Sequence, residues 1–496
     1  MSEFAEYEEI HVISDIHMGG RPGFQVLRET QRLADFIRWV AMQRPAERVA
    51  LILNGDVFDT LAEDISGYVA VDDGWRTIRR IIFDEPAFEP VWDALKEFVH
   101  TELRTLVIII GNHDIEVSFP SVQRLIIERL TTGNAEAKAR IEFSTQGAGY
   151  TCTVGKARVF CTHGNEVDAW NFNRYEDLSK VARRLNVGRP LVTDDWIPNA
   201  GTRMVKEVMN DIKRKYAWID LLKPENSAAV GTLLAIDPSQ VGKIKQLPAI
   251  VGAKLVGDSQ VDQRLSADGL QVAASTEPFS LDSMLGPNVL ASMQSAGSRP
   301  SSSGDEMLLA MESRTPGVSP DTVKFKDAPL GLPQLIWDRL TGWITGVGPE
   351  EALRQALQDW LKGDASFKID NQDETYTEVT NRLGPNIDFV VTGHTHLERA
   401  IKRERGGFYF NCGTWIRLMR FTEAMLANTQ SFNPVYGVLT NGSMSAIDSA
   451  MINGKPLLLD QTSSVSISLD GARTVGRLNH VDANGQPVPV QEFVRT

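Results

Sequence analysis

The first 175 residues alternate short apolar runs with segments in which apolar residues recur every three or four positions. The apolar runs predict strands at Ile10–Ser14, Val49–Leu53, Thr105–Ile110 and Ala157–Cys161. Between the first two runs, Leu33, Phe36, Ile37 and Val40 keep a helical spacing. A helix that crosses between two strands makes them parallel neighbours, so this part of the chain predicts an α/β architecture.

The strand pattern returns at Ile387–Val391 and Gly407–Asn411, after a long segment of different character. In that segment, apolar residues at helical spacing predict a helix across Thr202–Ile219, and Pro349 opens another helix that ends before Gly363. Between these helices, the run GSRPSSSGD (Gly297–Asp305) is typical of a flexible loop. We therefore interpret the segment as a mainly helical insertion.

The last part of the chain is expected to be rich in β-structure. Beyond Val435 the runs VYGVL, SVSISL and VPVQEFV are short and alternating, and Asn-Gly and Asp-Gly pairs separate them. These features are typical of β-hairpins. The predicted organisation is a core in two parts, 1–175 and 383–445, interrupted by the insertion 176–382 and followed by a C-terminal extension, 446–496.

Composition narrows the class of protein. The 496 residues are 42% hydrophobic and 23% charged, as in ordinary globular proteins. A net charge of -13 argues against a protein that coats nucleic acid through general basicity. The cysteines, Cys152, Cys161 and Cys412, are odd in number and lack C-x-x-C spacing, so neither a disulfide framework nor a thiolate zinc site is predicted. With no apolar leader and no run of ~18 apolar residues, we expect a cytoplasmic protein without a transmembrane segment.

Polar residues that bind metal ions follow the predicted strands directly. Listed by strand, these residues are Asp15 and His17; Asp56 and Asp59; Asn112, His113 and Asp114; His163; and, after the late strand, His394 and His396. Five of the eight histidines fall in these clusters. If the strands share one sheet, the clusters meet at its carboxyl edge, where open parallel sheets place their ligands.

This mixture of carboxylate, imidazole and amide groups suits Mn²⁺, Fe, Zn²⁺ or Ni²⁺, and contains too much nitrogen for Mg²⁺ or Ca²⁺ alone. The number of candidate ligands exceeds what one ion needs. Two ions about 3.5–4 Å apart that share a carboxylate use the full set, and this arrangement serves in-line displacement at phosphorus.

The motifs D-x-H, G-D-x-x-D, G-N-H-D, H-G and G-H-x-H, in this order, resemble those of the calcineurin-like metallophosphoesterase superfamily over residues 8–175 and 385–445. The resemblance implies a four-layer αββα sandwich. It also implies a ligand set in which Asp15, His17 and His396 hold one metal, Asn112, His163 and His394 hold the other, and Asp56 bridges. His113 then meets the phosphate and protonates the leaving group. Asp114, beside it in the sequence, is the second candidate catalytic residue, and the sequence leaves open which carboxylate keeps the pKa of His113 high.

The function implied is that of a dinuclear metal-dependent phosphoric ester hydrolase. We expect metal-bound hydroxide to attack a phosphodiester or pyrophosphate bond of a small nucleotide-like or lipid-linked substrate, with two divalent ions, Mn²⁺ first and Fe, Zn²⁺ or Ni²⁺ as alternatives. A nuclease acting on DNA or RNA and a non-catalytic scaffold that retains the fold are the alternative functions.

The insertion is expected to act as a cap that shapes substrate access, as it often does in this superfamily. Residues 177–245 contain twelve Lys and Arg against eight Asp and Glu, which favours an anionic substrate or a peripheral membrane contact, or else a solvated helical face.

Four further residues have two interpretations each. Asp59 either caps a helix or orients a metal ligand. Asn165 and Arg174, in the run that follows His163, either contact a phosphate or substrate or lie in a solvated loop. Asn411 resembles an asparagine that the superfamily carries at a strand end, and otherwise forms a turn.

Overall fold

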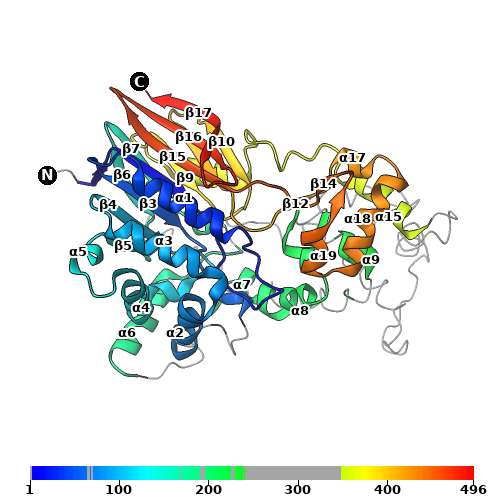
Figure 1. Ribbon diagram of the computed structural model, residues 1–496, viewed down its shortest axis with the longest axis horizontal. Coiled ribbons are helices and arrows are strands. Elements are labelled where there is room, and N and C mark those ends of the chain that lie inside the picture. Colours follow the sequence, from blue (N-terminus) through cyan, green and yellow to red (C-terminus); the bar gives the residue numbers. More distant parts are fainter. Residues whose placement is uncertain are drawn as a thin grey trace.

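The computed structural model describes residues 3–63, 68, 71–168, 170–189, 196–224, 228–229, 231–237, 240 and 348–495. Within them, two β-sheets pack face to face, and a separate cluster of helices lies at one end of the sheets (Figure 1). The predicted flexible loop Gly297–Asp305 lies outside the described residues.

The larger sheet has seven strands. In spatial order they are β17 (Pro487–Arg495), β16 (Arg473–Val481), β15 (Ser463–Asp470), β2 (Glu9–Ile13), β3 (Val49–Asn54), β4 (Arg104–Ile109) and β5 (Ile141–Ser144). β2 to β5 are parallel neighbours, and the sequence predicts this pairing for the first two of them. β15, β16 and β17 form antiparallel hairpins, and β15 pairs with β2. The C-terminal hairpins therefore extend the core sheet.

The smaller sheet has six strands. In spatial order they are β1 (Ala5–Tyr7), β6 (Tyr150–Val154), β7 (Ala157–Cys161), β9 (Phe389–Thr392), β11 (Phe408–Cys412) and β10 (Glu398–Lys402). β9 is parallel to both β7 and β11. This pairing joins the two halves of the core across the insertion.

The space between the sheets is filled by apolar side chains from both. Ile10 and Ile52 of the larger sheet pack with Phe389 and Phe410 of the smaller one, in a cluster of buried residues. All three cysteines are free and buried in the same cluster, so they are core residues. Burial of this surface, at about 25 cal/mol per Å² of apolar area, drives the face-to-face packing.

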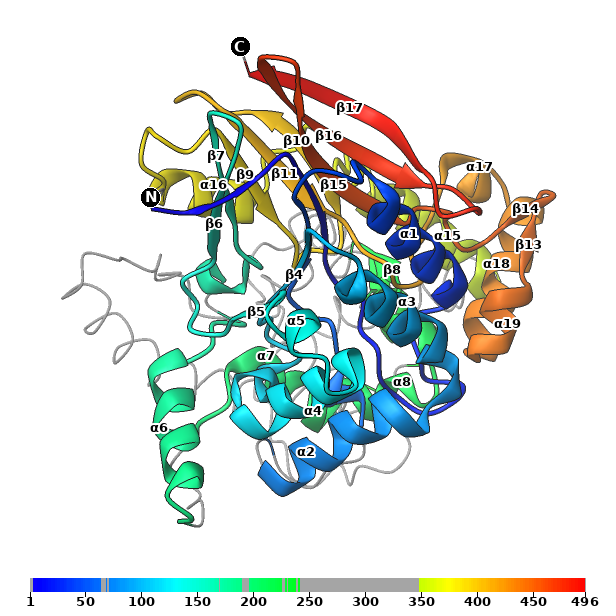
Figure 2. The same cartoon turned by 60° about the vertical axis from the view of Figure 1, so that its left-hand side comes forward.

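Helices cover the outer faces of both sheets (Figure 2). α1 (Thr30–Met42), α3 (Glu89–His100) and α4 (Pro120–Thr131) pack on the larger sheet, and α16 (Glu374–Arg382) packs on the smaller one. α1 forms because its apolar residues fall on one stripe that the sheet buries. The expected four-layer αββα sandwich is confirmed.

The short elements around these layers are η1 (Thr60–Ala62), α2 (Val71–Arg79), η2 (Arg80–Asp84), η3 (Pro86–Phe88), η4 (Ile115–Ser118), α5 (Ala135–Lys138), η5 (Asn165–Val167) and α6 (Tyr175–Asn186).

The helical cluster on the right of Figure 1 has its own apolar core, which includes the buried side chains of Trp218, Leu357 and Phe432. Its elements are α7 (Ala200–Met204), η7 (Val205–Met209), α8 (Asn210–Lys213), η8 (Ala217–Asp220), β8 (Leu222–Lys223), α9 (Gly231–Ile236), α15 (Pro349–Trp360), β12 (Met419–Arg420), α17 (Glu423–Leu426), α18 (Thr429–Asn441), α19 (Met444–Ser449), β13 (Met451–Ile452) and β14 (Lys455–Pro456). The elements of this cluster that come from the predicted insertion, 176–382, are mainly helical, and α17, α18 and α19 join them from beyond it. The predicted helix over Thr202–Ile219 ends at Lys213, and a 3₁₀ turn follows.

The run VYGVL corrects one prediction. It lies inside α18, and the strand prediction for it is wrong. Phe432, Val435 and Leu439 are buried at helical spacing, and they pack in the same cluster as the insertion helices. A five-residue window cannot distinguish the two periods, so the contacts of the longer segment decide.

Candidate metal centre

The candidate ligands come from both sheets. Asp15 and Asp56 follow β2 and β3 of the larger sheet, whereas His163 and His394 follow β7 and β9 of the smaller one. The sequence predicts that the clusters meet if their strands share one sheet. The strands belong to two sheets, so that premise is wrong. The clusters still converge, because the two sheets pack with these strand ends at a common edge.

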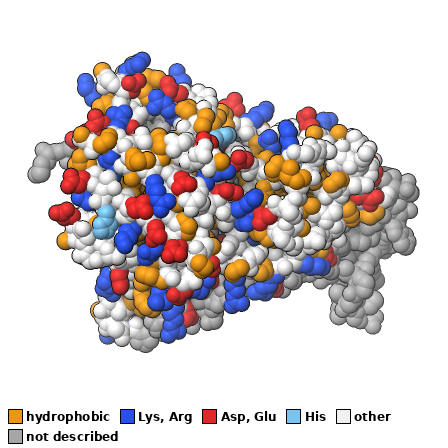
Figure 3. Space-filling model, viewed as in Figure 1, with side chains coloured by type: hydrophobic (Ala, Val, Ile, Leu, Met, Phe, Trp, Pro, Cys, Tyr) orange, Lys and Arg blue, Asp and Glu red, His pale blue; other side chains and the backbone are white. Residues whose placement is uncertain are grey.

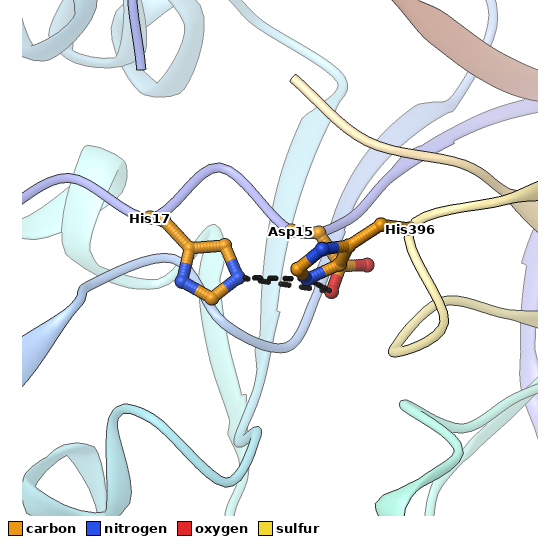
Figure 4. A group of neighbouring side chains, drawn as sticks. All are labelled: Asp15, His17 and His396. Atoms are coloured by element: carbon orange, nitrogen blue, oxygen red, sulfur yellow. Dashed lines mark hydrogen bonds and ion pairs between the residues drawn. The ribbon is translucent and has the colours of Figure 1, made fainter. Parts of the chain in front are cut away.

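One group of ligand atoms is formed by Asp15, His17 and His396 (Figure 4). Nε2 of His396 lies 3.2 Å from Oδ1 of Asp15 and 3.2 Å from Nε2 of His17. Nε2 of His17 lies 3.9 Å from the same Asp15 oxygen. Ligand atoms about 2.1 Å from one ion stand roughly 3 to 3.5 Å from one another, so these spacings fit a shared cation.

A second group joins Asp15, Asp56 and His163. Oδ2 of Asp56 lies 3.2 Å from Nε2 of His163 and 3.6 Å from Nε2 of His17. Asp56 therefore stands between a histidine of each expected ligand set. Burial alone would raise the pKa of Asp56, but the nearby His163 and His113 hold it well below its ordinary value.

Several buried polar atoms at this edge lack hydrogen-bond partners among the described residues. They are Oδ1 of Asn112, and also Oδ1 of Asp15 and Nε2 of His163, which lie 3.2 Å from other candidate ligands without the geometry of a hydrogen bond. Nδ1 of His163 is 2.8 Å from the carbonyl oxygen of Asn54, so it donates there and leaves a lone pair on Nε2. An unpaired buried polar atom costs about 1–3 kcal/mol, and bound cations would satisfy all three. The residues present fit a pair of divalent ions.

Several candidate ligands share the same strained backbone conformation, a positive φ. Of nine described residues other than glycine with positive φ, five are candidate ligands: Asp15, His17, Asp56, His394 and His396. Left-handed backbone is uncommon for residues with a Cβ, and it persists where the surroundings enforce it, most often at functional sites. A Cβ added at Gly111 would lie 2.0 Å from Oδ1 of Asp56, so a glycine is required beside this carboxylate.

His113 lies beside the ligand groups. Its ring is 4.8 Å from that of His17, and its Nδ1 is 3.1 Å from Oδ1 of Asp59. Burial alone would lower the pKa of His113, but the charge of Asp56 and the hydrogen bond with Asp59 raise it to about 9. Asp59 also caps η1 by accepting from the backbone N–H of Ala62. The capping interpretation of Asp59 is therefore confirmed. Its other oxygen lies 3.9 Å from Nδ1 of the candidate ligand His17, so its role in orienting a ligand stays a prediction.

Asp114 is adjacent to His113 in the sequence, but its carboxylate binds backbone N–H groups and not the ring of His113. Its carboxylate accepts from the backbone N–H groups of Gly111, at 2.8 Å, and Val57, at 2.7 Å. These bonds tie the loop after β4 to the loop after β3. Asp59, rather than Asp114, is the carboxylate that faces His113.

Glu116 and Thr60 form a buried chain behind His113. Oγ1 of Thr60 lies 2.8 Å from the carbonyl oxygen of His113 and 2.9 Å from Oε2 of Glu116. A hydroxyl has one hydrogen, and the carbonyl can only accept it. Both contacts are therefore hydrogen bonds when Glu116 is protonated and donates to Thr60. Burial, together with the charge of Asp114, raises the pKa of Glu116 to about 7, which agrees with this arrangement.

We expect Glu116→Gln to remove a pH dependence of stability. The folded-state pKa of Glu116 is raised above its ordinary value of 4.5, so the unfolded chain ionises first and the stability contributed by this group falls as pH rises from about 4.5 to about 7. The free energy of unfolding of the wild type should fall relative to that of the variant by about 2 to 3 kcal/mol over this range. Urea unfolding at pH 5 and pH 8 measures the difference, and a constant offset would contradict the prediction.

The loop after His163 holds the two predicted substrate contacts. Asn165 is fully buried, and its amide donates to the carbonyl oxygen of Asn171 at 3.1 Å. Arg174 precedes α6, with Nη1 4.0 Å from Oδ2 of Asp177. These contacts give both residues a role in holding the loop, and we do not include either in the proposed substrate site. Asn411 likewise holds a loop, by donating to the carbonyl oxygen of Gly393 at 2.8 Å.

Sequence reasoning missed two residues of this loop. Nδ2 of Asn173 donates to the carbonyl oxygen of Gly111 at 2.8 Å, directly before Asn112. Oδ2 of Asp168 lies 2.8 Å from Nε2 of His394. The polar run NEVDAWNFN is the one signal in the sequence, and it does not indicate which residues these side chains contact.

The four-layer sandwich and the candidate ligands at its edge are the arrangement of a dinuclear metal-dependent phosphoric ester hydrolase. Residues 9–224 match the calcineurin-like phosphoesterase family, which confirms the resemblance seen in the motifs. The match ends before β9, so it does not include His394 and His396, which the G-H-x-H motif predicts and which both contact Asp15 in the structure.

The other comparisons add little. Among solved structures, a dimetal phosphatase from Danio rerio is 10% identical and covers 98% of each chain with a TM-score of 0.30, which is too low to support an argument. A search of curated proteins gave no significant match. Within the described residues, no helix has the length and apolarity needed to cross a membrane.

Proposed function

We propose that this protein hydrolyses a phosphodiester or pyrophosphate bond of a small nucleotide-like or lipid-linked substrate, with Mn²⁺ as the first candidate metal. The observation that carries the proposal is the position of Asp56, whose Oδ2 lies within 3.6 Å of both His17 and His163. A carboxylate between two sets of ligands is the arrangement that two neighbouring cations require.

Asp15, His17 and His396 would hold one ion, and Asn112, His163 and His394 the other, with Asp56 shared between them. Divalent ions bound here supply a hydroxide nucleophile at neutral pH and offset the negative charge of the phosphoryl oxygens. The chain itself contributes the pre-formed loops, which hold these side chains before any substrate arrives.

His113 is the proposed general acid. The charge of Asp56 and the hydrogen bond with Asp59 raise the pKa of His113, which favours its protonated form, and the hydrogen bond from Nδ1 to Asp59 leaves the proton on Nε2 available to a leaving oxygen. Thr60 holds the backbone of His113 by donating to its carbonyl oxygen. Proton delivery from a positioned imidazole contributes about 10²–10⁴-fold to such reactions.

Contacts of the insertion with the site loops support a small substrate. The N–H of Gly201 donates to the carbonyl oxygen of Trp170, in the loop after His163, at 2.8 Å. Nδ2 of Asn210 donates to the carbonyl oxygen of Leu61, two residues after Asp59, at 2.9 Å. The insertion therefore stands against two of the loops that carry the site, where it would limit the size of what enters.

Charge favours a small molecule over nucleic acid. The net charge of the chain is -13, and on the face seen in Figure 3 the Lys and Arg side chains are interspersed with Asp and Glu among the coloured residues. A nuclease normally offers a continuous basic surface to the phosphate backbone. A local cation is nevertheless close to the site, because the buried Lys213 acts on the pKa of both Asp59 and His113.

A panel assay tests the proposal. Metal-free protein is reloaded with Mn²⁺ and incubated with bis-p-nitrophenyl phosphate, p-nitrophenyl phosphate, UDP-sugars, cyclic nucleotides and single-stranded DNA, and an Asp56→Asn variant serves as the inactive control. We expect hydrolysis of the diester and pyrophosphate substrates. Preference for DNA would instead support the nuclease alternative, and hydrolysis of no substrate despite bound metal would support the scaffold alternative.

A further inference from the structure

The candidate ligand His394 is held by a carboxylate that neither the motifs nor the family match assigns to the site. We infer that Asp168 positions His394 so that Nδ1 of this histidine faces the second ion. The inference rests on the proposed metal centre, and it adds a positioning residue together with the identity of the ligand atom.

The hydrogen bond is short and well supported. Oδ2 of Asp168 lies 2.8 Å from Nε2 of His394, across 226 residues of sequence. The same carboxylate accepts from the N–H of Trp170 at 2.8 Å and from Nδ2 of Asn171 at 2.6 Å. Three donors thus fix both oxygens, so the carboxylate presents a stationary acceptor to the ring.

The acceptor determines which nitrogen of His394 is able to bind metal. A carboxylate with these three donors only accepts, so the hydrogen of the neutral ring is on Nε2 and the lone pair is on Nδ1. His163 has the opposite arrangement, since its Nδ1 donates to Asn54 and its Nε2 is unpaired. The two rings are neighbours, with centroids 5.3 Å apart.

The backbone of His394 is held as firmly as its ring. Its N–H donates to Oδ2 of Asp15 at 2.9 Å, and its φ is 71°. The loop of Asp168 is anchored in turn, because Asn173 donates to the carbonyl oxygen of Gly111. Because hydrogen bonds hold both the backbone and the ring of His394, its imidazole has one orientation. Carboxylates that hold metal-binding histidines in this way also raise the basicity of the ring, and their loss typically costs 10–100-fold in metal affinity.

The test compares Asp168→Asn with the wild type by calorimetric titration of the metal-free proteins with Mn²⁺, elemental analysis after dialysis, and electron paramagnetic resonance. We expect the wild type to bind two ions with a spin-coupled spectrum. The variant should bind one of its two ions about 10–100-fold more weakly and give the spectrum of isolated Mn²⁺. Asp177→Asn is the matched control, because it makes the same chemical change nine residues further along, on α6, where the carboxylate faces Arg174 and Lys180, so it should retain both ions.

A double-mutant cycle with His394→Ala shows whether Asp168 acts through this ring. The two substitutions should then be non-additive in metal affinity, whereas additive effects would overturn the inference. Unchanged affinity of Asp168→Asn for both ions, or equal loss in Asp177→Asn, would also overturn it while leaving the proposed function intact. A wild type that binds no metal would instead overturn the proposed function and the inference together. If Asp168→Asn does not fold, Asp168→Glu takes its place, with a smaller loss of affinity expected for one ion only.

Discussion

Asp56→Asn is expected to remove at least one of the two ions and to lower phosphodiesterase activity by at least ~100-fold, since even residues that merely orient ligands are worth about 10–100-fold. The substitution retains the shape of the side chain, and its remaining oxygen can still accept from the N–H of His113, which Oδ1 does at 2.9 Å. What it removes is the negative charge beside His17 and His163.

Elemental analysis of dialysed, Mn²⁺-loaded protein measures this effect directly, alongside turnover of bis-p-nitrophenyl phosphate. Asp470→Asn is a suitable control, because this aspartate ends β15 at the surface, with its side chain 62% exposed. Two retained ions per chain in Asp56→Asn would contradict the bridging role, whatever the activity of the variant.

His113→Ala is expected to leave both ions in place and to lower kcat by about 10²–10⁴-fold on substrates with poor leaving groups. His113 is outside the proposed ligand sets, and the hydrogen bond with Asp59 orients its ring beside them. A leaving alkoxide needs a proton, whereas p-nitrophenolate leaves readily without one. The loss should therefore be much smaller on bis-p-nitrophenyl phosphate.

The comparison of the two substrates is the decisive measurement. A variant that loses activity equally on both has lost something other than proton delivery, and one that retains turnover of an alkyl diester removes His113 from the mechanism. Asp59→Asn provides a graded check, since it leaves the imidazole in place but removes the carboxylate at 3.1 Å that raises its pKa.

The sequence predicted β2, β3, β4, β7, β9 and β11, in which apolar residues dominate. It did not predict β1, β5, β6 and β10, which are short or contain more polar and partly exposed residues. β2, β3 and β4 have no exposed residue along their lengths, and their apolar residues mark them although β2 also contains Glu9 and His11 and β4 begins with Arg104 and the half-buried Thr105. The candidate ligands were equally easy to recognise in the sequence, because each follows such an apolar run directly. A short apolar run by itself is compatible with either a strand or a helix. VYGVL is helical because one side of it packs into the helical cluster.

The identity of the ligand side chains, their order and their position after strands were thus determined by the sequence alone, since side-chain chemistry and strand ends are local properties. The tertiary structure decided which groups meet. Parallel pairing of β7 with β9 brings His394 to a loop 226 residues away, where Asp168 receives its hydrogen bond. In the same way, the turn after β3 places Asp59, and not the adjacent Asp114, against His113. Hydrogen-bond partners depend on distances of a few tenths of an ångström between separate loops, and only the packed sheets establish those distances.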